Sequence, residues 1–215
     1  MSGVAQVTGA VPGADHAPPT RAQLEAARDG TIDDVIAPGL AVLFCGINPG
    51  LYSGATGWHF ARPGNRFWKT LYLAGFTDRV LDPSEQRLLL PLGLGLTNVV
   101  RRTTATAAEL SDEELRAGAK RVRALVGQAC PRWLAVVGIS AYRAAFDDPR
   151  AQMGRQQASI GGTGIWVLPN PSGLNASYQL PQLAQAFEAL RWVAIGSGFR
   201  TDPGNTKAPE GTADP

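Results

Sequence analysis

Cysteine and histidine are scarce in this chain, which has two residues of each among 215. Cys45 lies in an apolar run and Cys130 ends a helical pattern, and their spacing fits neither a disulfide framework nor a zinc site. We therefore expect two buried, reduced thiols and no metal. Because His16 falls in a terminal stretch, only His59 remains for catalysis, which excludes most Ser–His and Cys–His schemes.

Long apolar runs and strong charge are also missing. No stretch approaches the ~20 apolar residues of a transmembrane helix, and the N-terminus lacks the basic-then-apolar order of a signal peptide. The sequence therefore predicts a cytoplasmic protein with no membrane partner. The net charge of +2 permits a polyanionic partner without requiring one.

Three catalytic signatures are absent as well. The chain has no G-x-x-x-x-G-K-[ST] phosphate loop, no G-x-G-x-x-G dinucleotide loop and no G-x-S-x-G nucleophile elbow. Nucleotide-driven chemistry, nicotinamide chemistry and α/β-hydrolase chemistry are therefore not expected, and neither is a cofactor.

What remains has the composition of one domain with two tails. Residues 1–19 and 198–215 are rich in Gly, Ala, Pro and Thr without periodicity, which predicts disordered tails. Residues 20–197 are expected to form a single domain. Hydrophobic residues make up 44% of the chain, enough for a core.

Apolar runs alternate with amphipathic segments along this domain. The runs predict buried strands at residues 40–47, 93–100, 132–139 and 164–170. Helical patterns lie at residues 21–30, 31–39, 65–76, 111–130, 140–146 and 179–197, with Thr20, Ser111 and Ser140 as expected N-caps. This alternation indicates an α/β sandwich, with a mainly parallel sheet between helices.

Two of the predicted strands end in an Asn-Pro turn. Asn48-Pro49-Gly50 follows the first strand, and Asn170-Pro171 opens the loop after the fourth. Carboxyl ends of parallel strands share one edge of a sheet, where open α/β sheets bind ligands. Such pairs are also ordinary turn chemistry, but two at matching strand ends favour a site. Built from amides, Asn side chains and aromatics, this site suits a flat polar ring such as a nucleobase.

The segments CGINPGLYSGATGWHFARPGNRFWKTLYLAGF (45–76) and WVLPNPSGLNASY (166–178) resemble the mismatch-specific uracil-DNA glycosylases, bacterial relatives of thymine-DNA glycosylase. The resemblance extends over about residues 30–195. It implies a three-layer α/β/α sandwich around a short parallel sheet. It also implies a monomer that excises uracil, and lesions such as 3,N4-ethenocytosine, from mispairs with guanine in double-stranded DNA. The product would be an abasic site without strand cleavage.

The resemblance also implies roles for the two asparagines. Asn48 cannot act as a base, but its amide oxygen can hold a water and aim it at the sugar carbon C1′. That arrangement predicts a dissociative reaction, in which the glycosidic bond breaks before water attacks. Asn170 would help to hold the departing base.

The base and the DNA have further predicted contacts. Phe60 would be the stacking floor of the flipped base, with the N–H groups of Ile47 and Phe60 at the base edge and Gly46 permitting close approach. Leu174, beside Gly173, would fill the space that the base leaves. The alternatives are a core aromatic at Phe60 and a core leucine at Leu174. Phosphate contacts are expected from three residues: Ser172, Lys69 and Arg66.

The chain departs from the family pattern at three places. Ala176 stands where bacterial members often carry an arginine, Asn98 stands where close relatives have a lysine, and Trp58-His59 replaces a smaller apolar pair. His59 would either add an acid near the site or lie in an exposed turn.

Two other functions stay open at this stage. A non-catalytic protein could bind the mismatch or lesion without releasing a base, and a small-molecule enzyme could act on free nucleosides. The retained Asn48 favours an enzyme over the first alternative, and the Leu174 wedge gives no support to the second.

Overall fold

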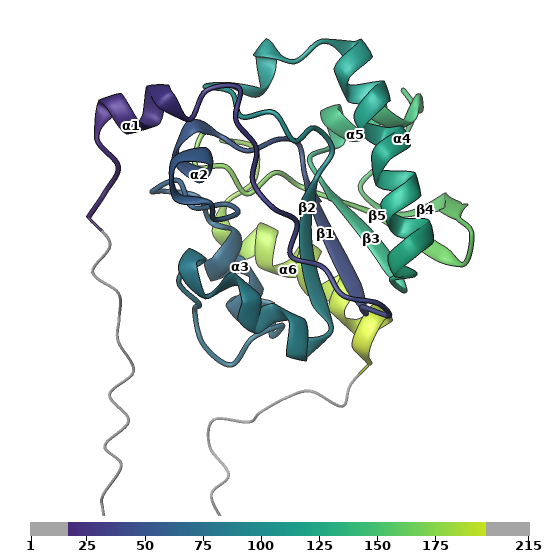
Figure 1. Cartoon of the computed structure of the whole chain (residues 1–215). Helices are drawn as coiled ribbons and strands as arrows, with labels where there is room; N and C mark the ends of the chain where they lie inside the picture. Colours follow the sequence, from purple (N-terminus) through teal and green to yellow (C-terminus); the bar gives the residue numbers. More distant parts are fainter. Residues whose placement is uncertain (1–16, 197–215) are drawn as a thin grey trace, which may run out of the picture.

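The structure is a computed structural model that describes residues 17–196 (Figure 1), so the predicted disordered tails lie almost entirely outside the described residues. Five strands form one sheet in the order β2-β1-β3-β5-β4. Their bounds are Val42–Gly46 (β1), Leu94–Asn98 (β2), Trp133–Val137 (β3), Gly154–Ile160 (β4) and Thr163–Leu168 (β5). All neighbours pair in parallel except β4, which is antiparallel to β5. The mainly parallel sheet is as predicted.

Helices cover both faces of the sheet, as Figure 1 shows. Side chains of a strand alternate between its faces, so neighbours Leu43 and Phe44 enter different cores. Phe44 packs with Phe67 and Phe187 beneath α3 (Phe67–Leu73) and α6 (Leu180–Ile195). Leu43 packs with residues of α4 (Asp112–Ala129) and α5 (Ile139–Phe146). The expected three-layer α/β/α sandwich is therefore confirmed.

The capping signals of two helices are confirmed and a third is wrong. Thr20 and Ser111 both form capping boxes, at α1 (Arg21–Ala26) and α4. Ser140 does not cap α5, because that helix begins one residue earlier and its N-cap is Gly138 with φ 121°. Glycine reaches this backbone conformation without a steric penalty.

Several other predictions fail for tertiary reasons. The helix expected at residues 31–39 is wrong: the chain there is extended, and Val35 exchanges two backbone hydrogen bonds with Leu96 on the edge strand β2. Strand β4 was missed because its side chains are mostly exposed, which removes the apolar run that marks a strand. Cys130 is exposed, not buried, at the left-handed C-cap of α4.

Three short helices were also not predicted: α2 (Leu51–Thr56), the 3₁₀ helix η1 (Pro83–Leu92) and the 3₁₀ helix η2 (Ala107–Glu109). Helix α2 lies within the glycine-rich stretch after β1, and η1 precedes β2. The two are joined by Gln86 of η1, which donates to the carbonyl oxygen of Gly57 at the end of α2.

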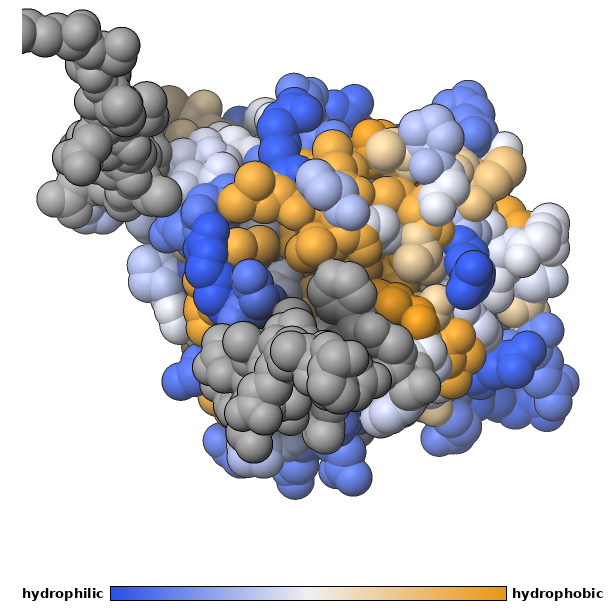
Figure 2. Space-filling view, turned by 90° about the horizontal axis from the view of Figure 1, so that it is seen from below, coloured by the Kyte–Doolittle hydropathy of each residue, from blue (hydrophilic) through white to orange (hydrophobic). Residues whose placement is uncertain are grey.

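The opposite end of the sheet differs in character. Seen from below, hydrophobic side chains gather on this face (Figure 2).

Within residues 17–196, every helix is too short or too polar to cross a bilayer. The polar, turn-rich loops lie at the carboxyl ends of the strands, and the candidate site is found there.

Candidate active site

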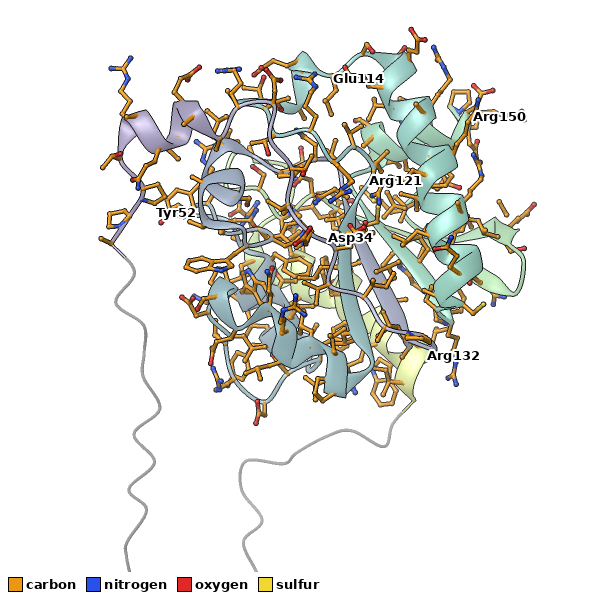
Figure 3. All side chains as sticks on the ribbon, in the orientation of Figure 1. Asp34, Tyr52, Glu114, Arg121, Arg132 and Arg150 are labelled. Atoms are coloured by element: carbon orange, nitrogen blue, oxygen red, sulfur yellow. The ribbon has the colours of Figure 1, made fainter. Side chains whose placement is uncertain are left out.

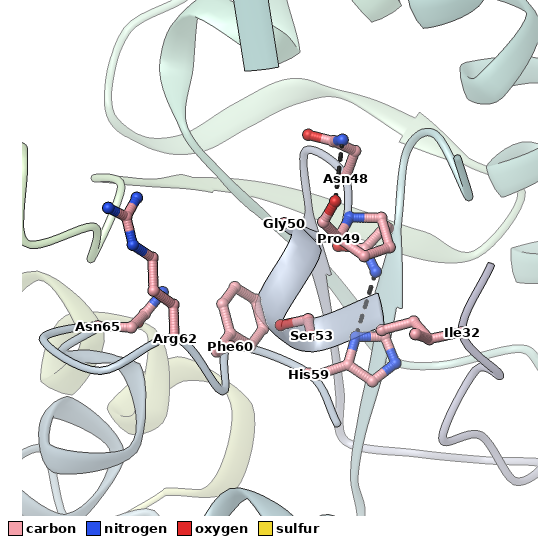
Figure 4. Close-up of a pocket in the computed structure, with 10 residues that line it drawn as sticks. Ile32, Asn48, Pro49, Gly50, Ser53, His59, Phe60, Arg62 and Asn65 are labelled. Carbon is pink, nitrogen blue, oxygen red and sulfur yellow. Dashed lines mark hydrogen bonds between the residues drawn. The ribbon is translucent and has the colours of Figure 1, made fainter. Parts of the chain in front are cut away.

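Both Asn-Pro loops line one cavity of about 270 Å³ at the carboxyl end of the sheet. Seven of the predicted site residues contribute to its lining: Gly46, Ile47, Asn48, Phe60, Asn170, Ser172 and Leu174. A second cavity of about 110 Å³ adjoins it and shares Asn48, Phe60 and Arg62 (Figure 4). Of the other three, Gly173 is in the same loop as Leu174, while Arg66 and Lys69 are outside both linings.

The hydrogen bonds of Asn48 fix which end of its amide faces the cavity. Its Nδ2 lies 3.0 Å from the carbonyl oxygen of Arg102 and 2.7 Å from Oγ1 of Thr104. The Thr104 hydroxyl donates its own hydrogen to the carbonyl of Thr106, so it must accept from Asn48. The amide nitrogen is therefore anchored. The amide oxygen has no donor among the described residues.

Phe60 offers one aromatic face to the cavity. Its other face stacks on Phe67 with ring centroids 3.9 Å apart and planes 16° from parallel. The backbone of Phe60 has φ 54°, a left-handed conformation that a bulky residue rarely adopts. Such strain persists only where the surroundings enforce it, and it is common at binding sites.

Those surroundings are contacts that hold the backbone on both sides of Phe60. The side chain of Gln86 accepts from the N–H of His59 at 2.8 Å and donates to the carbonyl of Gly57 at 3.1 Å. The hydroxyl of Ser53 accepts from the N–H of Ala61. The Phe60 N–H, between them, has no acceptor among residues 17–196. Sequence patterns gave no signal for the role of Gln86, which reaches the loop from η1.

His59 is buried, with 1% of its surface exposed, so the predicted exposed turn is wrong. Its Nε2 lies 3.0 Å from the carbonyl oxygen of Asp33 and must carry the hydrogen. Nδ1 then accepts from Asn98 Nδ2 at 3.2 Å. Burial lowers the pKa of His59, which favours this neutral form. An acidic role near the site is therefore not favoured.

This contact orients the carboxamide of Asn98 toward the cavity floor. A Cβ added at Gly46 would lie 2.4 Å from Asn98 Oδ1 and 3.2 Å from Phe60 Cζ, so the glycine is needed for these two side chains to meet there. Asn98 appeared in the sequence only as a departure from relatives. The structure identifies it as a lining residue of the smaller cavity.

The backbone of Asn98 is also held by a side chain from α4. Arg121 of α4 donates to the carbonyl oxygen of Asn98 and, at 3.0 Å, to Oγ1 of Thr97. The same guanidinium forms an ion pair with Asp34 at 3.0 Å, and Figure 3 shows the two side chains facing each other. A helix remote from the cavity in sequence thus fixes the end of β2.

The amide of Asn170 is oriented the opposite way from that of Asn48. Its Oδ1 accepts from the N–H of Ser172 at 2.9 Å, which closes a turn. The backbone carbonyl oxygen of Asn170 accepts from Asn175 Nδ2. The amide nitrogen has no acceptor within the described part of the chain. Leu174, further along this loop, is 78% exposed, so the core-leucine alternative is wrong.

Arg66 holds this loop in place. Its guanidinium donates to the carbonyl oxygens of four residues: Pro171, Ser172, Asn175 and Tyr178. Gly173 also lies close to the backbone of Gly64, because an added Cβ would be 2.7 Å from that carbonyl oxygen. Four of the five N–H donors of Arg66 are thus occupied, and its predicted phosphate contact stays a prediction. Lys69 is exposed on α3.

The chemistry available to the cavities is limited. Their lining contains no Asp, Glu, Cys or Lys. Among residues 17–196, no three His, Cys, Asp or Glu side chains group closely enough to hold a metal ion. What the lining offers is an amide acceptor at Asn48, an amide donor at Asn170, a second amide at Asn98 and the face of Phe60.

Comparison with known proteins identifies the superfamily of this chain. Residues 34–193 match the family model of the uracil DNA glycosylase superfamily. The fold is similar to the solution NMR structure of a protein from Methanosarcina acetivorans that is described as a candidate uracil DNA glycosylase. The TM-score is 0.54 at 18% sequence identity, over 76% of this chain and 98% of the other. At that identity the likeness shows the fold alone.

Proposed function

Because the chain belongs to the uracil DNA glycosylase superfamily, whose membership implies hydrolysis of N-glycosidic bonds in DNA, we propose that it excises uracil from mispairs with guanine in duplex DNA. Ethenocytosine and thymine are further candidate bases. The base is flipped into the cavity and released, and an abasic site remains without strand cleavage. The observation that carries this proposal is the fixed amide of Asn48, whose oxygen faces the cavity.

Asn48 acts by placing a water. Its oxygen accepts a hydrogen bond from the water and directs a lone pair of that water toward C1′. Because an amide is too weak a base to activate water before bond cleavage, the glycosidic bond breaks first. The result is an oxocarbenium-like sugar and a uracil anion. Water then adds to the sugar cation and loses a proton, and the uracil anion takes up a proton, so that the net products are the abasic sugar and neutral uracil. Uracil is a better leaving group than thymine and is expected to be preferred.

The other amides and Phe60 bind the base. Uracil presents an N–H between two carbonyl oxygens, so the oxygen of Asn98 can accept from that N–H while Asn170 Nδ2 donates to a carbonyl. The N–H groups of Phe60 and Ile47 are further donors at the base edge. As the bond breaks, negative charge grows on the uracil carbonyls, and fixed donors stabilise it. Stacking on Phe60 adds about 1–3 kcal/mol.

Leu174 serves as the wedge of the flipping step. An exposed leucine beside the cavity can replace stacking area that the flipped base gives up. Flipping costs a few kcal/mol and costs less for a mispair, which contributes to selectivity. We expect one monomer to bind one site, with Ser172 and Lys69 on the phosphates.

The test is an excision assay on a labelled duplex with one U·G pair. The protein is added under single-turnover conditions, and alkali is then used to cleave abasic sites. We expect a break at the uracil position only after alkali. No release of uracil would contradict the proposal. Tight binding to U·G or abasic DNA without release would favour the non-catalytic alternative, and turnover of free deoxyuridine would favour the nucleoside enzyme.

A further inference from the structure

Arg62 is the only charged side chain that lines either cavity. His59, the other titratable residue in the linings, is held neutral. Arg62 lines both, it is exposed, and its guanidinium has no hydrogen-bond or ion-pair partner among residues 17–196. In Figure 4 its side chain extends away from the turn that carries it, and its guanidinium group stands clear of the other labelled side chains. This is a free cation at the mouth of an acid-free cavity.

The other arginines near this edge of the sheet are not free. Their guanidinium groups donate to carbonyl oxygens or pair with carboxylates in each case: Arg66, Arg101, Arg102 and Arg121. Arg62 therefore differs from them in having its full charge available to a ligand.

The backbone that carries Arg62 is firmly placed. The carbonyl oxygen of Arg62 accepts from the N–H of Asn65 at 2.9 Å, and Asn65 Oδ1 accepts from the N–H of Phe67 at the start of α3. Gly64, in the middle of this turn, touches Gly173 of the wedge loop. The turn that carries Arg62 is thus fixed against the loop that carries Leu174, and both side chains line the larger cavity.

A flipped nucleotide has a neutral base before cleavage, and its charge lies on the flanking phosphates. We propose that Arg62 binds a phosphate next to the flipped nucleotide, and so holds the backbone in the bent path that brings the base over Phe60. This inference rests on the proposed function, because it requires a flipped nucleotide in the cavity. Arginine suits the role, since its planar fork can pair with two phosphate oxygens.

The salt dependence of binding tests the charge contact. Affinity for a duplex with a tetrahydrofuran abasic analogue opposite guanine is measured between 50 and 200 mM salt. Each phosphate contact contributes about 0.9 to the slope of log affinity against log salt. Over this range the affinity of the wild type should therefore fall about 3.5-fold more than that of Arg62→Gln. Arg62→Lys should retain the slope. Arg87→Gln is the matched control, because Arg87 is an exposed arginine of η1 outside both linings.

A neutral backbone locates the contact. One methylphosphonate is placed in turn at the phosphates 5′ and 3′ of the analogue and, as a reference, five nucleotides away. When the methylphosphonate replaces the contacted flanking phosphate, we expect Arg62→Gln to cause no further loss of affinity. When it is at the reference position, the substitution should cause its full loss of affinity. An unchanged salt slope, or an equal loss at every position, would overturn the inference. The inference would also be overturned if Arg62→Gln slowed base release without weakening DNA binding, because that result would place Arg62 on the leaving base. If the wild type does not bind the duplex, the proposed function fails as well.

Discussion

The two Asn-Pro turns have the same residues at the same edge of the sheet, yet they present opposite ends of an amide. Asn48 has its nitrogen anchored by a carbonyl and a hydroxyl, so its oxygen faces the cavity. Asn170 has its oxygen anchored by a backbone N–H, so its nitrogen is available. The neighbours of each asparagine therefore decide whether it supplies an acceptor for water or a donor for a developing anion.

The two turns also differ in what stabilises them. The first is held by the backbone of residues 102–106, which is itself fixed by the ion pairs of Arg102 with Asp29 and Glu114. The second is held by hydrogen bonds within its own loop and by one guanidinium, that of Arg66. Substitutions in the first turn should therefore affect chemistry, and those around the second should affect how DNA is engaged.

The largest effect is expected for Asn48→Ala. Loss of the group that places the water should lower the single-turnover excision rate by about 10²–10³-fold. Affinity for abasic DNA should hardly change, since the neighbouring contacts remain. Rates come from quenched U·G excision assays and affinities from fluorescence anisotropy. A variant with full rate would remove Asn48 from the mechanism.

Asn170 offers a sharper separation of roles. Asn170→Asp keeps an oxygen for the N–H of Ser172 but removes the free N–H donors, whereas Asn170→Ala removes both. If the donor stabilises the departing base, both variants should lose about 10–100-fold in rate, the value of a hydrogen bond to a charged group. If Asn170 serves only to close the turn, the aspartate variant will keep its activity. Asn170 would then not be a donor to the departing base, and the contrast with Asn48 would be wrong.

Arg66→Gln should loosen the second loop without touching the first. We expect about a tenfold loss in excision from duplex DNA, on the order of 1.4 kcal/mol, because several charge-assisted bonds to carbonyl oxygens are removed. The Asn48 network should be intact, so a single-stranded substrate that needs no wedge should be processed nearly normally. Equal losses on both substrates would mean that Arg66 supports the catalytic residues as well.

Leu174→Ala removes only the tip of that loop, so its effect should be smaller than that of Arg66→Gln. We expect excision from duplex DNA to fall by roughly fivefold, near the low end of the stacking energy that the wedge replaces. Val80→Ala is the control, because it shortens an exposed apolar side chain outside the cavity linings. An equal loss in the control would point to a general surface effect.

The smallest expected effect is on the pH dependence of stability, through His59, which holds the side chain of Asn98. Burial lowers the pKa of His59, so below its usual value near 6.5 the unfolded state binds the proton more readily than the folded state. Stability should therefore be complete above that pH and decrease as the pH falls below it. In thermal melts between pH 7 and 5, the Tm of the wild type should fall more steeply than that of His59→Gln. His16→Gln is the control for the second histidine, and parallel slopes for all three would contradict the assignment.

Local signals in the sequence were sufficient for the four buried parallel strands and the two turns, but not for the exposed strand β4. Ser111 caps its helix, and strands buried on both faces have continuous apolar runs. Contacts between distant segments could not be read in this way. Gln86 reaches a loop 27 residues before it, and Val35 pairs with Leu96 in place of the predicted helix. No periodicity or spacing records such contacts, because they arise only once the chain is folded.

The extended segment before β1 bears on where this catalytic unit begins. The family match starts at residue 34. Ile32 nevertheless lines the smaller cavity, and the carbonyl of Asp33 holds the ring of His59. A boundary drawn at the start of this match would thus cut through the wall of the pocket. A gene fusion or a shortened version of the protein must therefore begin before residue 32 if the pocket is to stay whole.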